Sequence, residues 1–175
     1  MTPVGHAAVG WVLGHRHRFA VTTAVVVGAL APDIDFVLWW APQFNAWHRV
    51  VTHNLPFALA VAAIAGWVAH RRKASVRAVA LGAFVGVLSH LLVDACMDTS
   101  ASNGIGVAIA WPLSDAMWSP FNLLTPTNAV GWADHAAAAR GTLQGLAYEG
   151  AVAVLALALW WRGHRKTTPC PESSS

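Results

Sequence analysis

Residues 89–98 read SHLLVDACMD and close a run, beginning at Val76, that is otherwise almost purely apolar. His90, Asp94 and Asp98 follow one another at intervals of four residues, so on a helix they lie on one stripe. A water-soluble helix turns such a stripe toward solvent, but the other side chains of this segment suit lipid. The stretch therefore predicts a membrane helix whose polar stripe faces other helices.

The composition indicates a membrane protein. Of the 175 residues, 56% are hydrophobic and only 11% are charged, whereas a soluble domain carries about 25% charged residues. The length allows one domain, which we expect to be embedded in the membrane over residues 1–166, with a disordered cytoplasmic tail at 167–175. Two cysteines, Cys96 and Cys170, form no disulfide or metal-thiolate framework.

Four segments are apolar enough to cross a bilayer, and a fifth crosses part of one. The predicted spans are Phe19–Ala41, Asn54–His70, Val76–Met97 and Leu143–Trp161, and the half-span is Val4–Gly14. We therefore predict an all-α fold, a multi-pass membrane helical bundle with four spans plus a short N-terminal half-span. The long loop at 99–142 contains apolar stretches that are expected to lie on the membrane surface.

The basic residues predict the orientation. All but Arg49 and Arg140 fall into three clusters, which lie before the first span, between the second and third, and after the fourth. Alternating spans bring these clusters to one side, which the positive-inside rule makes cytoplasmic. Tryptophan pairs at 39–40 and 160–161 occupy span ends, where aromatic belts form.

Polar side chains from five segments reach the same outer layer of this bundle. At about 1.5 Å per helical residue, His90 and Asp94 lie about 20 and 26 Å above Arg77. The same count places a further set of side chains at about 14 to 26 Å above the basic clusters: His6, Asp33, Asp35, His53 and Glu149.

Such charges need compensation. Each costs about 2.5–3.5 kcal/mol at membrane depth, and Arg49 is the basic residue expected nearby. The missing positive charge is most simply one or two divalent metal ions, because imidazole and carboxylate suit Zn²⁺, Mn²⁺ or Fe²⁺.

The individual motifs are open to plainer interpretations. His90 and Asp94 could grip one ion, although this spacing is also that of a hydrogen-bonded pair. At residues 31–35, APDID, Pro32 breaks the span and one Asp would suffice as a helix cap. Two Asp residues favour one as ligand and the other as an orienting group or general base. Asp98 is either a further ligand or a solvated helix end.

The remaining candidates lie on other segments. Residues 48–53 read HRVVTH, so at least one of the two histidines comes from a loop, and Asn54 is a fair cap for the helix that follows. Arg49 would suit a phosphate oxyanion. His6 by itself is better explained as a buried core histidine, and only the level it shares with the other polar residues makes it an equal candidate for a ligand. Glu149 is an intramembrane carboxylate and hence a functional candidate.

Taken in order, His6, PDID at 32–35, HRVVTH at 48–53, HLLVD at 90–94 and a later WP at 111–112 resemble the bacterial membrane-bound metal-dependent hydrolases of the LexA-regulated inner-membrane type. That family is similar to zinc-dependent phospholipase C, an all-helical enzyme in which His and Asp hold zinc ions for phosphodiester hydrolysis. The resemblance implies metal ligands at His6, Asp33, His48 or His53, His90 and Asp94, with further roles for Asp35 or Glu149.

We therefore predict a membrane-embedded metal-dependent hydrolase that acts on a phosphoester or other ester of a lipid or lipid-linked substrate. One or two divalent ions, with zinc as the first choice, would be held by His6, Asp33, His48, His53, His90 and Asp94. The predicted catalytic residues are Asp35, Arg49 and Glu149. We expect a bacterial cytoplasmic membrane protein with its site toward the extracytoplasmic side, and the bilayer and a lipid substrate, but no nucleic acid, as partners.

Two other classes of protein use similar residues. An ion, proton or metal transporter also buries carboxylates and histidines, but it would distribute them across the membrane rather than gather them at one level. A haem protein uses paired histidines on facing helices, which leaves the neighbouring carboxylates unexplained.

Overall fold

The computed structural model describes residues 1–98, 104–124 and 135–165, and helices account for most of them. The elements in chain order are α1 (Pro3–Gly14), α2 (Phe19–Leu30), the 3-10 helix η1 (Ala31–Leu38), α3 (Phe44–Trp47), α4 (Leu55–Arg71), α5 (Val76–Cys96) and α6 (His135–Arg165). These described ranges contain no extended strand, only an isolated bridge between Val107 and Trp118. The all-α prediction is confirmed.

Three helical stretches are long and apolar enough to cross a membrane: Phe19–Leu38, Val76–Cys96 and Leu143–Gly163. The fourth, α4, is equally apolar but has 17 residues. At about 26 Å it falls slightly short of a hydrocarbon core of about 30 Å. Helix α1, with 12 residues, is the predicted half-span. The pattern of spans is therefore confirmed, with the second span the shortest.

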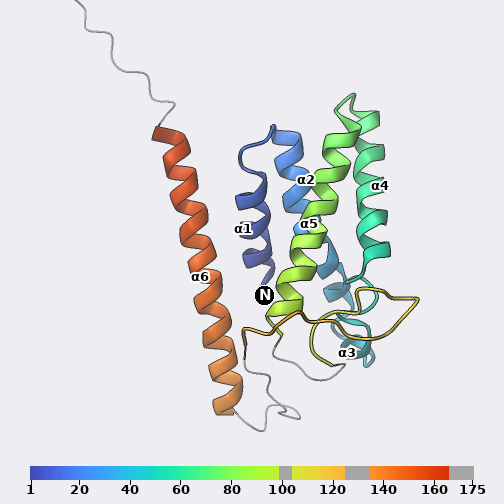
Figure 1. Ribbon diagram of the computed structural model, residues 1–175, viewed down its shortest axis with the longest axis vertical. Helices are drawn as coiled ribbons and strands as arrows, with labels where there is room; N and C mark the ends of the chain where they lie inside the picture. Colours follow the sequence, from blue (N-terminus) through green and yellow to red (C-terminus); the bar gives the residue numbers. More distant parts are fainter. Residues whose placement is uncertain (99–103, 125–134, 166–175) are drawn as a thin grey trace, which may run out of the picture.

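Helix α5 lies at the centre of the bundle (Figure 1), where it packs against both α2 and α4. Helix α1 packs against α2, and α6 lies outside the bundle against α1. The α1–α2 turn, the α4–α5 turn and the C-terminal end of α6 all lie at one end. We call this the basic end, because it carries Arg16, Arg18, Arg71–Lys73, Arg77 and Arg162, and we call the opposite end the site end.

Two glycines allow α2 and α5 to approach closely. A Cβ atom on Gly28 would collide with the backbone of Ala83, and one on Gly86 would collide with the backbone of Val25. Small residues at helix contacts serve this purpose in membranes, where packing rather than hydrophobic burial drives association. The contact fixes α5 beside the last turn of α2, and therefore beside the start of η1.

Some predicted boundaries are wrong. The first span ends at Leu38 rather than Ala41, and its α-helix stops at Leu30, because Pro32 lacks the backbone donor that a continuing α-helix needs. Helix α6 begins at His135, so the predicted loop 99–142 is shorter than expected. The alanine-rich residues 136–139 favour helix and extend α6 backward from the apolar span Leu143–Gly163. The predicted tail at 167–175 lies outside the described residues.

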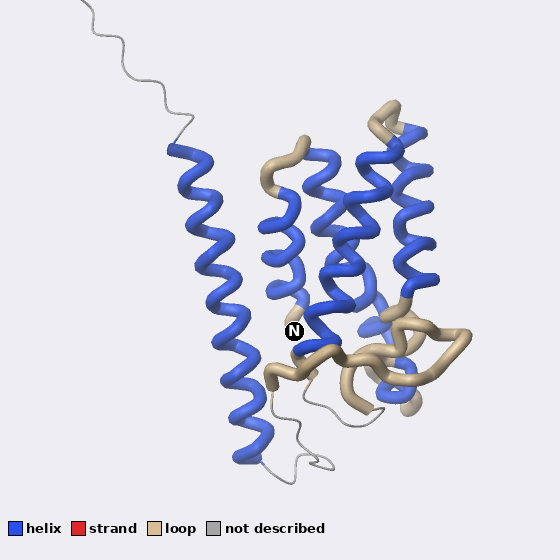
Figure 2. The backbone as a smooth tube through the Cα atoms, in the orientation of Figure 1, coloured by secondary structure: helices blue, strands red, loops and turns tan. Residues whose placement is uncertain are grey.

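The longer loops of the described chain gather at the site end, whereas the short α1–α2 and α4–α5 turns lie at the basic end (Figure 2). Residues 104–124 are held there by backbone hydrogen bonds from Leu55 N to Ile109 O (3.0 Å), from Ala108 N to Arg49 O (3.0 Å) and from Leu123 N to Cys96 O (2.7 Å). This segment therefore joins the start of α4 to the end of α5 beside the predicted site.

Candidate metal centre

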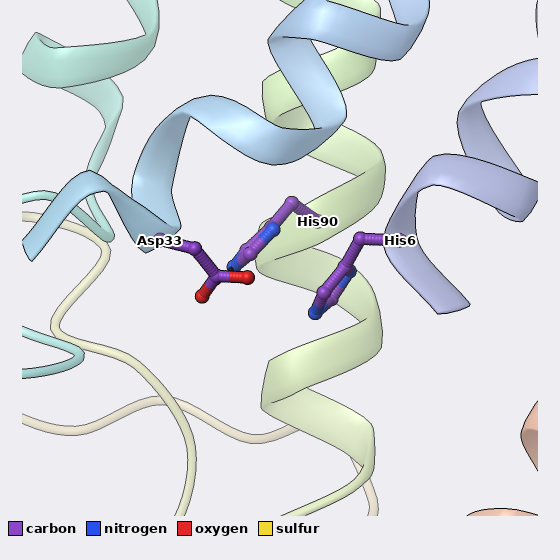
Figure 3. Close-up of side chains that lie close together, drawn as sticks. All are labelled: His6, Asp33 and His90. Carbon is purple, nitrogen blue, oxygen red and sulfur yellow. Dashed lines mark ion pairs between the residues drawn. The ribbon is translucent and has the colours of Figure 1, made fainter. Parts of the chain in front are cut away.

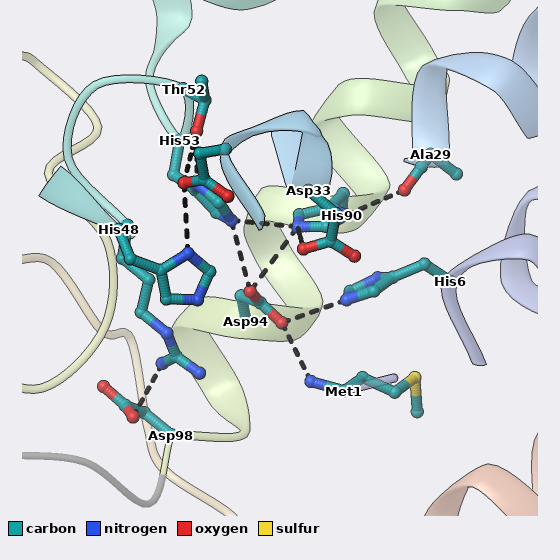
Figure 4. A network of polar contacts seen from close by, with 12 residues as sticks. Met1, His6, Ala29, Asp33, His48, Thr52, His53, His90, Asp94 and Asp98 are labelled. Atoms are coloured by element: carbon teal, nitrogen blue, oxygen red, sulfur yellow. Dashed lines mark hydrogen bonds and ion pairs between the residues drawn. The ribbon is translucent and has the colours of Figure 1, made fainter. Parts of the chain in front are cut away.

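All six predicted metal ligands meet at the site end, contributed by α1, η1, α5 and the connection before α4. Three overlapping groups each bring potential ligand atoms within 4.8 Å of one another. They are His6–Asp33–His90, Asp35–His48–His53 and His53–His90–Asp94. Figure 3 shows the first group converging from three separate elements, and Figure 4 shows the wider network.

His90 is oriented by the backbone of α2. Its Nδ1 lies 2.7 Å from the carbonyl oxygen of Ala29, and because a carbonyl only accepts, Nδ1 must carry the proton and donate. In the neutral ring, the other nitrogen, Nε2, then carries a lone pair. A backbone partner of this kind is the usual means of fixing the tautomer of a metal-binding histidine.

His53 is oriented in a similar way by Thr52. The Thr52 hydroxyl donates to Asp35 Oδ2 at 2.9 Å, so its oxygen accepts from His53 Nδ1 at 3.0 Å. His53 Nε2 is consequently also a lone pair. Complete burial of this imidazole lowers the pKa of His53, although its contact with Asp94 opposes the shift. A neutral ring is the form that binds a metal.

Three potential ligand atoms therefore face one another. His53 Nε2 and His90 Nε2 are 3.1 Å apart, and each lies 3.5 Å from Asp94 Oδ2. A point equidistant from these three atoms lies about 2.0 Å from each, which is the length of Zn–N and Zn–O bonds. The arrangement repels itself electrostatically unless a cation or a proton lies within it, and it fits a divalent metal ion.

His6 and Asp33 extend this group. The His6 ring stacks on His90 with centroids 3.7 Å apart, and its Nε2 lies 3.1 Å from Asp94 Oδ1. Asp33 Oδ1 lies 3.7 Å from His90 Nε2. Among the described residues, His6 Nδ1 and Asp33 Oδ2 are buried without a hydrogen-bond partner. Buried polar atoms are normally satisfied, so these two point to a missing ligand.

Asp35, His48 and His53 form the second side of the cluster. Asp35 Oδ2 lies 3.1 Å from His48 Nδ1 and 3.8 Å from His53 Nδ1. Within the described chain, Asp35 Oδ1 is buried and has no hydrogen-bond partner. Asp33 and Asp35 reach opposite sides because two steps along a 3-10 helix, at three residues per turn, change the direction of a side chain by about 120°.

Asp94 is the hub of the network. It is 2% exposed, and besides the three imidazoles its Oδ1 lies 3.1 Å from the amino nitrogen of Met1. A buried carboxylate is stable only beside positive charge or several donors. The two oxygens of Asp94 face different parts of the cluster: Oδ1 lies next to Met1 and His6, and Oδ2 lies next to His53 and His90.

Arg49 lies beside the cluster rather than within it. Its Nη1 is 2.6 Å from Asp98 Oδ1, and the other Asp98 oxygen accepts from Gly106 N at 2.9 Å. Arg49 has a φ of +66°, a left-handed conformation that is uncommon for residues with a Cβ atom. Asp98 belongs to none of the three candidate metal groups in the described chain. The structure therefore favours Asp98 as a fixed partner of Arg49, rather than as a further metal ligand or a solvated helix end.

Glu149 on α6 also lies apart from the candidate groups. Its carboxylate accepts from the backbone nitrogen of Thr2 at 2.5 Å and from the Thr2 hydroxyl at 2.6 Å. Thr2 is the N-cap of α1, the helix that carries His6. Among the described residues, Glu149 is therefore linked to His6 through the N-cap of α1.

Two groups that orient the cluster, Thr52 and the Ala29 carbonyl, were not predicted. Neither gives a signal in sequence, because a lone Thr and a backbone carbonyl acquire their role only from their neighbours in space. Asn54, in contrast, is confirmed as the cap of α4. It accepts from Phe57 N at 2.8 Å and donates to the carbonyls of Val50 and Val51, and so it holds the turn that presents His53.

The fold and the site together define a helical membrane protein with buried His and Asp groups that could hold a metal ion. A family model described as YdjM inner membrane protein matches residues 1–167. The chain therefore belongs to the YdjM family of inner membrane proteins. No curated protein and no solved structure matches it.

Proposed function

We propose that this protein is a membrane-embedded hydrolase that depends on a divalent metal ion and cleaves a phosphoester or other ester of a lipid or lipid-linked substrate. The observation that carries the proposal is the triangle of His53 Nε2, His90 Nε2 and Asp94 Oδ2, with separations of 3.1 to 3.5 Å. The Nδ1 atoms of both histidines already have partners outside this triangle. A purely structural core would pair the three atoms of the triangle with donors.

The ligand set favours zinc, because imidazole and carboxylate are its ordinary nitrogen and oxygen ligands. His53, His90 and Asp94 would hold the ion, with His6 and Asp33 next to it and His48 on the side of Asp35. A bound divalent ion polarises the ester or phosphoryl oxygen and makes water a better nucleophile.

The chain's own residues would supply the remaining chemistry. Asp35 has one buried oxygen without a hydrogen-bond partner among the described residues, which supports its role as the base that accepts a proton from water. Arg49 would bind the substrate anion, and Asp98 would hold its guanidinium in place. The contacts of Glu149 with Thr2 favour a positioning role for this residue, through α1 and His6.

A lipid substrate is supported by the surface around the site. Large apolar side chains stand exposed there, on η1, directly after it and on the segment 104–124: Phe36, Trp39, Trp40, Leu113 and Phe121. Exposed apolar groups at the end of a membrane bundle suit the interface between headgroups and acyl chains, where Trp is enriched. The substrate's ester bond would lie at that depth.

The site end would face the extracytoplasmic side, because the basic end carries the positive charge that remains in the cytoplasm. A cysteine at Leu113, which is 93% exposed, should react with a membrane-impermeant maleimide in intact cells when Cys170 is replaced by Ser. A cysteine at Ala74, at the basic end, should react only after lysis. The reverse pattern would invert the orientation.

A transporter is less well supported. Among the described residues, the buried polar and charged side chains all belong to the site end: His6, Asp35, Thr52, His53, Asn54, His90, Asp94 and Asp98. A conduction path would need polar groups or water at other depths as well.

The deciding experiment measures the metal content of the detergent-purified protein by mass spectrometry and then its hydrolysis of phosphodiester and lipid phosphoester substrates. We expect about one or two equivalents of a divalent transition metal and an activity that chelation removes and zinc restores. If the protein holds no metal after mild purification and zinc reloading, the proposed hydrolase function is refuted.

A further inference from the structure

An apolar groove lies between α2 and α4 toward the basic end, remote from the candidate metal centre. Its volume is about 470 Å³, within the range of about 300–1,000 Å³ that is usual for small-molecule sites. Val79 and Ala83 of α5 form its floor, and its walls include Val27 of α2 and Ile64 and Val68 of α4.

The groove is open because α2 and α4 both pack on α5 but have little contact with each other. Helix α6 of the same chain does not cover it, since α6 lies on the other side of the bundle against α1 (Figure 1). In a membrane this opening faces acyl chains and not water, so an apolar chain must occupy it.

The groove does not lead to the metal centre. It runs from Phe19 at the start of α2 to Val27, a rise of about 12 Å. Beyond that depth, Ala58 of α4 packs against Val87 and Leu91 of α5 in a buried core cluster, and Ala31, which follows α2, packs against this cluster. An occupant is therefore confined to the half of the membrane nearer the basic end, and it is not the substrate of the proposed hydrolase.

Charge distinguishes this groove from other lipid-facing surface. Arg72, which follows the last turn of α4, is the one charged residue among the described residues that line it. The neighbouring Arg71 is directed elsewhere: its guanidinium lies 5.8 Å from the centre of the Trp67 ring, and Trp67 is not part of the groove lining. A cation at the mouth of an apolar groove complements a molecule with an anionic head and an apolar tail.

We propose that this groove is a binding site for an anionic phospholipid, with one acyl chain between α2 and α4 and the phosphate paired with Arg72. A zwitterionic lipid would fill the same groove but gain less from the Arg72 charge. The proposal is independent of the hydrolase, because it uses none of the residues of the metal centre.

Native mass spectrometry of the detergent-purified chain, titrated with phosphatidylglycerol or phosphatidylcholine, tests the proposal. We expect the wild-type chain to hold one phosphatidylglycerol more tightly than phosphatidylcholine. Arg72→Gln should weaken that binding about fivefold and remove the preference, whereas the matched control Arg71→Gln should retain both. Ala65→Phe, which fills the groove, should abolish tight binding of either lipid. Circular dichroism confirms that each variant is folded, and Ala20→Phe replaces Ala65→Phe if that variant is not.

Equal phosphatidylglycerol affinity in the wild type, Arg72→Gln and Arg71→Gln would overturn the proposal. The proposal would also be overturned if the wild-type chain were a dimer and Ala65→Phe, which fills the groove, made it dissociate. A second copy of the chain would then be the occupant. Metal content is expected to stay at the wild-type level in all these variants, so loss of the lipid site and loss of the metal site are distinguishable.

Discussion

The two ends of the bundle both carry charged side chains and use them in opposite ways. At the site end, His6, His53, His90, Asp94 and Asp98 are all at most 2% exposed. At the basic end, Arg71, Arg72, Lys73 and Arg77 are exposed. The first set points inward at other helices, and the second projects outward from helix ends.

This difference shows which charges the fold must compensate. An exposed Arg keeps most of its hydration and affects stability little. A buried carboxylate loses its hydration and destabilises the fold by several kcal/mol unless cations or donors surround it. The inward cluster therefore needs cations or donors around its carboxylates, whereas the outward one indicates only an orientation in the membrane and an affinity for anions.

The largest effect is expected from Asp94→Ala. This change removes the carboxylate that contacts His6, His53 and His90, and metal content should fall below about a tenth of the wild-type value, since even groups that only orient ligands cost about 10–100-fold in affinity. Asp115→Ala, which removes an exposed carboxylate, is the control. Equal metal content in the two variants, measured by mass spectrometry, would show that the buried carboxylate contributes no more to metal binding than the exposed one.

A smaller effect is expected from Gly28→Ala, because a Cβ at this position collides with the backbone of Ala83. Overpacking of this kind should lower the free energy of unfolding by about 1–3 kcal/mol, measured as a lower thermal midpoint in detergent. The control is Gly150→Ala on α6, where a Cβ meets no atom within 4 Å, and it should leave the midpoint unchanged or raise it. Similar midpoints for the two variants would contradict the close α2–α5 contact.

Thr52→Val keeps the shape of the side chain and removes the hydroxyl that links Asp35 to His53. We expect zinc affinity to fall by about 10–100-fold, as measured by competition with a chelating dye. Thr52→Ser restores the hydroxyl and should recover most of the loss. If serine failed to do so, packing of the methyl group rather than orientation of His53 would explain the effect.

The smallest effect is expected from Glu149→Gln. Glu149 contacts Thr2 and lies outside the candidate metal groups. Metal content should therefore stay within about twofold of the wild-type value, and stability should fall by about 0.5–1.5 kcal/mol, as for one weakened hydrogen bond. A loss of metal as large as that in Asp94→Ala would instead make Glu149 a ligand.

The sequence by itself determined the bundle and the composition of the cluster. Apolar length gives the spans, because a bilayer demands about twenty apolar residues per crossing. The positions of Arg and Lys bring the basic clusters together at one end, and the helical rise places the histidines and carboxylates at one level. These are local properties, and each can be read from a single segment.

Only the tertiary structure decided which of the polar residues at that depth belong to the candidate metal centre. It separates Glu149 and Arg49 from the candidate ligands, pairs Arg49 with Asp98, and makes Thr52 and the Ala29 carbonyl the groups that turn the His53 and His90 lone pairs inward. Height along a helix says nothing about rotation around it or about which helices are neighbours. Those depend on close contacts such as Gly28 against α5, which form only when the whole bundle packs.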